Sequence, residues 1–256
     1  MAIEYTTESG TKELSWASYA LDGRAHPRYF LSEKYFESFP PGSVVADIGC
    51  GDGRDLQQLL DRGCRGIGTE VGDSCLRGAR EAGRPVAKAG AEALPIASNS
   101  VDAVVFGGVL PFTEEDEAFA EIARILRPGG VLQAYYLGAG YAVRDLLFGV
   151  SLRNRYFGLR ALLNTVLIHT VGCKLPGRFG DTVYTSHRRL AQLYARHGLA
   201  LKTLIPSPTF LGLPVFIYHA VERVGAVQRS PGPAPRRSAV ATADRPGMAA
   251  LEAEAR

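Results

Sequence analysis

Cysteine and lysine are scarce in this chain of 256 residues, and their scarcity excludes several classes of protein. Only four cysteines occur, none in a C-x-x-C pair or at zinc spacing with histidine, so we expect neither a disulfide framework nor a metal site. Only five of the 29 basic residues are lysine, and no lysine-rich tract or RNA-binding signature occurs, which disfavours nucleic acid as a partner. Reduced cysteines favour a cytoplasmic protein.

Long hydrophobic runs are also missing. The longest runs from Ala161 to Cys173 and is interrupted by Asn164 and His169, whereas a bilayer span takes about 20 apolar residues. The N-terminus shows no basic segment followed by an apolar one, so we expect no signal peptide. A hydrophobic fraction of 46% excludes disorder of the whole chain and suffices for a core.

The net charge of +3 is unevenly distributed. Residues 1–137 hold 13 basic and 20 acidic side chains, whereas residues 138–189 hold 8 basic and 2 acidic ones. We therefore expect a cationic ligand in the acidic first half and an acceptor molecule with an anionic group beside the basic segment.

Apolar runs and helical periodicities alternate from residue 43 onward, which predicts an α/β fold: a doubly wound, mostly parallel seven-stranded sheet whose last strand is antiparallel. The strands are expected at 44–48, 66–69, 85–88, 101–106, 131–137, 199–205 and 215–224. The helices between them are expected at 54–62, 73–82, 114–126 and 187–197.

Three segments fall outside this alternation. N-terminal helices are expected over 12–21 and 27–39. The segment 138–186 is expected to form a helical lid insertion after the fifth strand, with helices over 143–150 and 159–170. Residues 1–224 then make one domain, and the Pro-, Arg- and Ala-rich residues 225–256 are expected to be a disordered tail.

A glycine-rich loop follows the first predicted buried strand, at Asp47-Ile48-Gly49-Cys50-Gly51-Asp52-Gly53. Its glycines allow a ligand to approach the backbone, but their spacing differs from that of dinucleotide-binding loops. Asp47, Asp52 and Asp55 would repel a pyrophosphate and favour a cation, and Glu70 ends the next strand, where an acid accepts hydrogen bonds from ribose hydroxyls. A nucleoside cofactor with positive charge, such as S-adenosyl-L-methionine, fits this pattern.

The chain resembles the class I S-adenosylmethionine-dependent methyltransferases of the small-molecule type. The resemblance rests on four segments in the family's order, which are residues 44–53, Gly68-Thr69-Glu70-Val71, residues 91–105 and residues 121–132. It covers roughly residues 43–137 and the closing helix and strands. It implies a Rossmann-like fold and the following cofactor-binding residues: Asp47, Gly49, Gly51, Gly53, Glu70, Val71, Ala91, Glu92, Phe106 and Gly107.

Two departures from the family pattern matter. Gly90 stands where relatives often have an aspartate for the adenine amino group, and Glu92 is the candidate to replace it. The run Gly107-Gly108-Val109-Leu110-Pro111-Phe112 is wholly apolar where many relatives carry polar residues or histidine, so any base must come from elsewhere.

Candidates on the acceptor side come from the insertion and the N-terminus. His169, Tyr184 and His187 are candidate catalytic bases. A lone histidine on an apolar run, such as His169, is more often packed than catalytic, and Ser186 beside His187 equally suits a plain helix cap. Tyr19, Tyr29, Arg144 and Arg153 are candidates for acceptor binding, the arginines as partners of an anionic group.

The sequence thus predicts methyl transfer to an oxygen, nitrogen or carbon atom of a small metabolite with an apolar body, in a protein that is a monomer or homodimer. Two alternatives remain open at this point. One is a non-catalytic protein that binds the same cofactor, and the other is a nicotinamide oxidoreductase.

Overall fold

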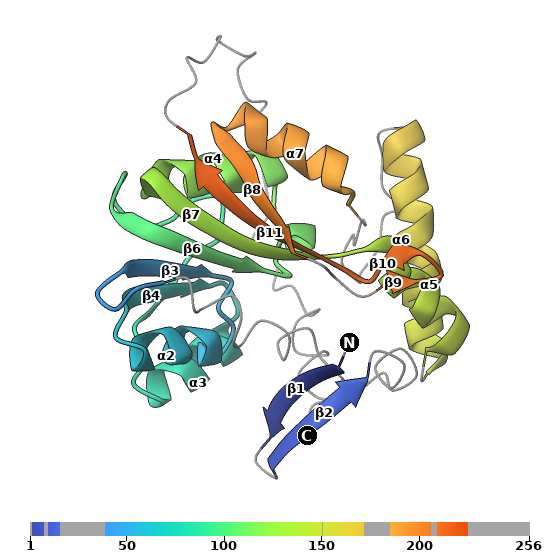
Figure 1. Cartoon of the computed structure of the whole chain (residues 1–256), viewed down its shortest axis with the longest axis horizontal. Helices are drawn as coiled ribbons and strands as arrows, with labels where there is room; N and C mark the ends of the chain where they lie inside the picture. Colours follow the sequence, from blue (N-terminus) through green and yellow to red (C-terminus); the bar gives the residue numbers. More distant parts are fainter. Residues whose placement is uncertain are drawn as a thin grey trace.

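A seven-stranded sheet forms the centre of the computed structural model, which describes residues 2–7, 10–15, 39–149, 151–171, 185–205 and 209–224 (Figure 1). Its strands are, in spatial order, β5 (Val86–Lys88), β4 (Arg65–Glu70), β3 (Val44–Ile48), β6 (Val101–Gly107), β7 (Leu126–Leu137), β11 (Phe216–Arg223) and β8 (Leu199–Ile205). The strands from β5 to β7 pair in parallel, and β11 is antiparallel to both its neighbours. The predicted fold class is confirmed.

Helices cover both faces of this sheet. α4 (Glu115–Ile125) and α7 (His187–Arg196) lie on one face, where Phe119 of α4 packs edge-on against Phe106 of the sheet. On the other face, Leu59 of α2 (Arg54–Asp61) packs against Val45. The remaining sheet helix is α3 (Asp73–Glu81). Because both faces are covered, β3 and β6 are buried almost throughout, as their continuous apolar runs predict.

The fifth parallel strand, β7, starts at Leu126, five residues before the predicted start. Leu126 pairs with Val101, and the register then shifts so that Val131 pairs with Ala103. Gly129 takes a left-handed conformation, with φ of 78°, within the extra residues. The turn signal Pro-Gly-Gly therefore marks an irregularity inside a strand and not its beginning.

The insertion contains the two expected helices, which begin earlier than predicted, as α5 (Ala139–Phe148) and α6 (Leu152–Thr170). A Cβ atom on Gly138 would lie 2.1 Å from the carbonyl oxygen of Pro214, so only glycine allows the chain to turn there. Pro214 belongs to a small hairpin, β9 (Thr209–Phe210) and β10 (Leu213–Pro214), which the sequence did not predict. No helix in the described ranges has the length and apolarity that a bilayer crossing requires.

The prediction of a helix over 12–21 is wrong where the structure describes that segment. Residues 10–15 form β2 (Gly10–Ser15), which pairs antiparallel with β1 (Ala2–Thr7). Thr6 lies opposite Thr11, and β-branched residues favour strands over helices. The rest of that predicted helix, the one over 27–39 apart from Phe39, and the tail 225–256 lie outside the described residues.

Candidate active site

The glycine loop lies at the carboxyl end of β3 and is fastened to the end of β4. The backbone N–H groups of Gly49 and Cys50 both donate to the carbonyl of Thr69, at 2.7 and 3.0 Å. Gly49 has φ of 69°, and a Cβ atom there would lie 2.3 Å from a methyl group of Val109. Glycine is therefore required twice, for the backbone conformation and for the close approach of the segment that follows β6.

The Glu70 carboxylate joins the loop to the start of α3. Its Oε2 accepts the N–H of Gly51 at 3.0 Å, and its Oε1 accepts the N–H groups of Val71 and Gly72 at 2.7 and 2.8 Å. An ionised carboxylate has about four acceptor positions, so the three backbone bonds leave room for a further donor. Glu70 is thus rigidly held where the resemblance predicts the ribose hydroxyls.

The buried carboxylates of Asp47 and Glu70 make this edge of the sheet electronegative. Asp47 is 4% exposed and Glu70 is 2% exposed. Burial raises the pKa of the Cys50 thiol far above its usual range, and the two carboxylates raise it further. A site that disfavours a thiolate in this way favours a cation, which fits the sulfonium and ammonium groups of S-adenosyl-L-methionine. Among the described residues, no cluster of three His, Cys, Asp or Glu side chains is placed to hold a metal ion.

Glu92 lies beside Gly90, the position where the resemblance places an adenine-binding aspartate. Its Oε2 is 2.7 Å from the place that a Cβ atom of Gly90 would take, and a methyl group of Val71 is 3.8 Å from the same place. Its Oε1 accepts the N–H of Glu114 at the start of α4. Val71 is half exposed, while Ala91 is buried beneath the loop. The carboxylate therefore lies beside the side chain that the resemblance places against adenine.

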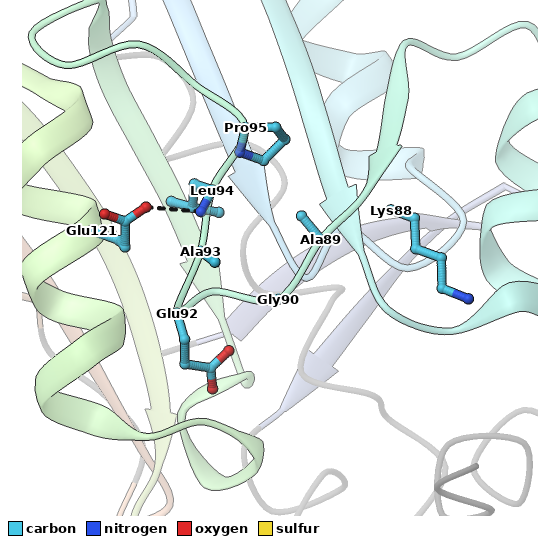
Figure 2. Close-up of a pocket in the computed structure, with 8 residues that line it drawn as sticks. All are labelled: Lys88, Ala89, Gly90, Glu92, Ala93, Leu94, Pro95 and Glu121. Carbon is cyan, nitrogen blue, oxygen red and sulfur yellow. Dashed lines mark hydrogen bonds between the residues drawn. The ribbon is translucent and has the colours of Figure 1, made fainter. Parts of the chain in front are cut away.

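An open pocket of about 580 Å³ runs along the same loop (Figure 2). Glu121 forms one wall, where its carboxylate accepts the N–H of Leu94 at 2.8 Å. The hydrogen bond from Arg124 lowers the pKa of Glu121, so this anchor stays ionised. The pocket is lined by Lys88, Ala89, Gly90, Glu92, Ala93, Leu94, Pro95 and Glu121. Glu92 alone among the predicted cofactor residues lines it.

The segment after β6 forms an apolar wall at the same edge of the sheet. A Cβ atom on Gly107 would lie 2.2 Å from the Tyr135 ring, so glycine lets the chain cross over that ring. The short helix η3 (Leu110–Phe112) follows, with Leu110 buried and Phe112 partly exposed. Phe106, which precedes Gly107, is fully buried in the core, so it supports the wall from behind.

The acceptor-side candidates are only partly described. His187 is the first residue of α7 and is exposed, while the Ser186 hydroxyl accepts the N–H of Arg189, so the two roles proposed for these neighbours are compatible. His169 and Arg153 lie on α6, but their side chains lie outside the described structure. Tyr19, Tyr29 and Tyr184 lie outside the described residues.

Arg144 is engaged within the insertion. Two of its nitrogens contact one oxygen of Asp145, at 2.6 and 3.1 Å, and its guanidinium lies 4.6 Å from the centre of the Tyr141 ring. Burial raises the pKa of Asp145, and Arg144 opposes that shift. An anionic acceptor that used Arg144 would have to compete with this carboxylate, so its role in acceptor binding stays a prediction.

Helix α6 exposes a stripe of apolar side chains. Its members recur every three or four residues and are 45–84% exposed: Leu152, Tyr156, Leu159, Leu163 and Val166. The opposite face of α6 packs against α5, where Ala161 is buried against Ala142. The insertion therefore presents an apolar surface that the described core does not cover.

Sequence reasoning missed a hydrogen-bonded chain of four side chains next to the sheet. His187 contacts His219, His219 contacts Tyr194, and Tyr194 contacts Tyr136, each at 2.9 Å. The signal that could have found it is His219 itself, a polar residue in the otherwise apolar run Phe216-Ile217-Tyr218-His219-Ala220-Val221.

Residues 46–134 match the methyltransferase domain family. A tRNA (carboxymethyluridine(34)-5-O)-methyltransferase of Mus musculus is 35% identical over 106 residues, which is 40% of this chain and 16% of that protein. An uncharacterized methyltransferase of Mycobacterium tuberculosis is 34% identical over 107 residues, 37% of this chain and 44% of that protein. The chain thus spans less than half the length of these curated relatives.

Solved structures of the same kind superpose on most of the chain. An S-adenosylmethionine-dependent methyltransferase from Mesorhizobium loti matches with a TM-score of 0.53 and 16% identity, covering 72% of this chain and 92% of that one. Geranyl diphosphate methyltransferase in complex with S-adenosylmethionine matches with a TM-score of 0.53 and 19% identity, covering 76% and 83%. Residues 46–134 thus form a methyltransferase domain, and the chain shares the fold of class I S-adenosylmethionine-dependent methyltransferases, which supports S-adenosyl-L-methionine as the cofactor.

Proposed function

We propose that the chain transfers a methyl group to an oxygen, nitrogen or carbon atom of a small, natural-product-type metabolite with an apolar body. The observation that carries this proposal is the apolar wall after β6. Its residues 107–112 include no acid, amide or histidine, and Phe112 is 39% exposed at the sheet edge. Such a wall suits an apolar molecule better than a polar base or amide.

The exposed stripe on α6 supports the same acceptor class. Apolar surface that stays open on a lid segment is typical of a binding surface for an apolar ligand or partner. The segment 138–189 carries 8 basic and 2 acidic residues, which favours an anionic group on the acceptor. Because Arg144 is paired with Asp145, we assign that group to arginines such as Arg153 and the exposed Arg155.

Bound S-adenosyl-L-methionine supplies a methyl carbon made electrophilic by the sulfonium charge. The residues of this chain then have to align an acceptor and exclude water. Glu70 and the loop around Gly49 and Gly51 hold one side, and the wall from Gly107 to Phe112 shields the other. Alignment of this kind contributes several kcal/mol, on the order of 7 or more in favourable cases. None of residues 107–112 can take a proton, so a hydroxyl or carbon acid needs a base from another element.

The test is a methylation screen with the purified chain and labelled S-adenosyl-L-methionine. Hydroxylated, amino and carboxylated metabolites are offered in one arm and total tRNA in the other, with products identified by mass spectrometry. A methylated small molecule supports the proposal. Label in tRNA alone would show that the chain shares the acceptor class named for the Mus musculus relative. Tight cofactor binding in calorimetry without any methylated product would favour a non-catalytic binding protein.

A further inference from the structure

We propose that His187 is the base that takes the proton of the methyl acceptor, and that His219, Tyr194 and Tyr136 are positioning residues that hold it in the proton-accepting form. The catalytic part of this inference rests on the proposed function. The hydrogen-bonded chain rests on the structure alone and can be tested without an acceptor.

The four side chains come from three elements and lead from the core to the surface. Tyr136 of β7, Tyr194 of α7 and His219 of β11 are all buried, with His219 completely so, while His187 at the start of α7 is exposed. Nδ1 of His187 contacts Nε2 of His219, and Nδ1 of His219 contacts the Tyr194 hydroxyl. The Tyr194 hydroxyl donates to the Tyr136 oxygen.

We propose one set of proton positions that satisfies all three contacts, because each ring nitrogen donates or accepts according to its tautomer. A tyrosine has one hydroxyl proton, so a Tyr194 that donates to Tyr136 accepts from His219. His219 therefore carries its proton on Nδ1 and accepts at Nε2. His187 must then donate from Nδ1, which leaves the lone pair on its Nε2 at the exposed end of the chain.

Burial keeps the inner side chains of this hydrogen-bonded set neutral. Burial and, to a smaller extent, the neighbouring His187 lower the pKa of His219 to about 4. Burial also raises the pKa values of Tyr136 and Tyr194. The elements that carry these side chains also bring charged groups: Arg189 on α7 and Glu115 on α4, which pair with each other at 2.6 and 3.0 Å, and the exposed Arg188. The Glu115 carboxylate is therefore neutralised by Arg189 and does not pair with His187 in this structure.

The pairing register of the strands places the four hydrogen-bonded side chains at the same level of the sheet as the predicted active site. Ile48 pairs with Phe106, Phe106 with Ala134, and Ala134 with His219, so these four residues form one row across β3, β6, β7 and β11. Neighbouring strands are about 4.8 Å apart, so His219 lies about 10 Å from Phe106.

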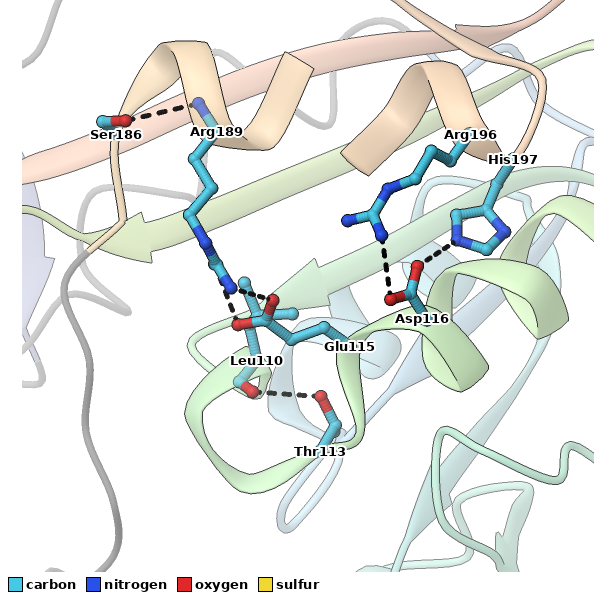
Figure 3. Close-up of polar contacts among 8 residues, drawn as sticks. All are labelled: Leu110, Thr113, Glu115, Asp116, Ser186, Arg189, Arg196 and His197. Atoms are coloured by element: carbon cyan, nitrogen blue, oxygen red, sulfur yellow. Dashed lines mark hydrogen bonds and ion pairs between the residues drawn. The ribbon is translucent and has the colours of Figure 1, made fainter. Parts of the chain in front are cut away.

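An ion pair joins the first turn of α7 to the first residue of α4, which follows the apolar wall. The guanidinium of Arg189 binds both oxygens of Glu115, and Glu115 begins α4 three residues after Phe112, where the wall ends (Figure 3). His187 stands two residues before Arg189 in the same first turn of α7, and we therefore place its ring at this edge of the sheet. The base that residues 107–112 lack is supplied from α7.

The proposed step is a proton transfer coupled to methyl transfer. The acceptor's O–H or activated C–H proton moves to Nε2 of His187, while the electron pair left on the acceptor atom bonds the methyl carbon. The methyl–sulfur bond breaks, and its electron pair stays on sulfur as a neutral thioether. The imidazolium of His187 keeps its Nδ1–H bond to His219 and releases the Nε2 proton to solvent, because this residue is exposed.

The first test is nuclear magnetic resonance of the full chain with ¹⁵N-labelled histidine. The chain has five histidines, so substitution of each by glutamine assigns its signals. We expect His219 to be neutral at pH 6 with its proton on Nδ1, and His187 to show an unprotonated Nε2 at high pH. A His187 protonated only on Nε2, or a charged His219 at pH 6, would overturn the proposal.

Variants then separate positioning from folding. Tyr194→Phe removes one hydroxyl and keeps the packing ring, so His219 and His187 should each become a mixture of tautomers. His219→Gln keeps an acceptor for His187 and should preserve its tautomer. His197→Gln is the matched control, because His197 directly follows the same helix as its C-cap residue but bonds Asp116 at 3.0 Å. Unchanged histidine signals in Tyr194→Phe would show that the hydrogen bonds to Tyr194 do not set the tautomers of His219 and His187.

The second test uses an acceptor found by the methylation screen. His187→Gln should lose about 10²–10⁴-fold in kcat at neutral pH, with less loss at high pH where an acceptor hydroxyl ionises by itself. The His197→Gln control should keep its activity. Full activity of His187→Gln would refute the role of His187 as the catalytic base, even if the resonance data confirm the hydrogen bonds among the four side chains. If the wild type methylates no small molecule, the proposed function fails while the resonance result still stands.

Discussion

Oε2 of Glu92 lies 2.7 Å from the position that a Cβ atom of residue 90 would occupy. In related methyltransferases, by the resemblance described above, an aspartate at that position holds the adenine amino group. Here residue 90 is glycine, and the Glu92 carboxylate lies in the space that a side chain at residue 90 would fill, beside Val71. We therefore predict that the Glu92 carboxylate, from two residues further along the loop, takes the place of that aspartate.

Exchange of these two side chains tests the compensation. Glu92→Ala should weaken binding of S-adenosyl-L-methionine by about 10- to 100-fold, because it removes a hydrogen bond to a charged group. Gly90→Asp combined with Glu92→Ala should restore most of that affinity. Isothermal titration calorimetry measures both variants. If Glu92→Ala binds as well as the wild type, adenine is held without this carboxylate.

A loss of stability at the start of α4 could also weaken cofactor binding in Glu92→Ala, so a control must exclude that cause. Glu92 also accepts the N–H of Glu114, so Glu92→Ala should lower the free energy of unfolding by about 1 kcal/mol. The double variant lacks the cap as well. Recovered affinity without recovered stability would therefore assign the binding effect to the carboxylate near residue 90.

Glu70 offers a second prediction about the cofactor. Glu70→Gln removes one charge and one acceptor oxygen from a carboxylate that already serves Gly51, Val71 and Gly72. We expect cofactor affinity to fall by about tenfold or more, measured by calorimetry. Asp102→Asn is the matched control, because Asp102 likewise accepts a backbone N–H, from Val44, but at the opposite end of β3. Equal losses of affinity in both variants would indicate a general loss of stability instead.

The buried strands were predictable because burial on both faces leaves a continuous apolar run. The predicted strand over 44–48 is confirmed to the residue, and the one over 101–106 ends one residue early. By contrast, the start of β7 depends on a register shift between Val101 and Ala103, which is a property of the pair of strands. A turn motif such as Pro128-Gly129-Gly130 carries no information about its partner strand.

The cofactor site was largely predictable because its residues are close in sequence. Residues from Asp47 to Gly53 and from Gly68 to Val71 belong to adjoining strands, and the loop bonds of Gly49 and Gly51 reach only that far. The chain of His187, Tyr194, His219 and Tyr136 was not predictable in the same way. Its members are up to 83 residues apart and meet only because β11 inserts between β7 and β8.

The buried His219 predicts how stability depends on pH. Its pKa is lowered from 6.5 to about 4 in the folded chain, so between these values the unfolded state binds more protons. The contribution of His219 to stability is therefore complete above pH 6.5 and is lost as the pH falls towards 4. The expected slope is at most about 1.4 kcal/mol per pH unit. Urea unfolding at pH 4.5 to 7 measures it.

A variant that cannot titrate separates His219 from the carboxylates. His219→Gln retains groups that can bond Tyr194 and His187 but takes up no proton in this range. Its free energy of unfolding should change less between pH 6.5 and 4.5 than that of the wild type. Identical slopes would show that His219 is protonated in the folded chain.

Two helical glycines predict opposite responses to the same substitution. A Cβ atom on Gly158 of α6 would lie 2.6 Å from the carbonyl oxygen of Ala142 and 2.7 Å from the nitrogen of Leu146, both backbone atoms of α5 that cannot give way. Gly158→Ala should therefore push α5 and α6 apart and lower the free energy of unfolding by about 1–3 kcal/mol. At Gly78 in α3 nothing lies within 4 Å, so Gly78→Ala should raise it by about 0.5–1 kcal/mol. Urea titrations of the two variants measure both changes. A Gly158→Ala variant as stable as Gly78→Ala would mean that the two helices of the insertion do not pack as closely as the structure shows.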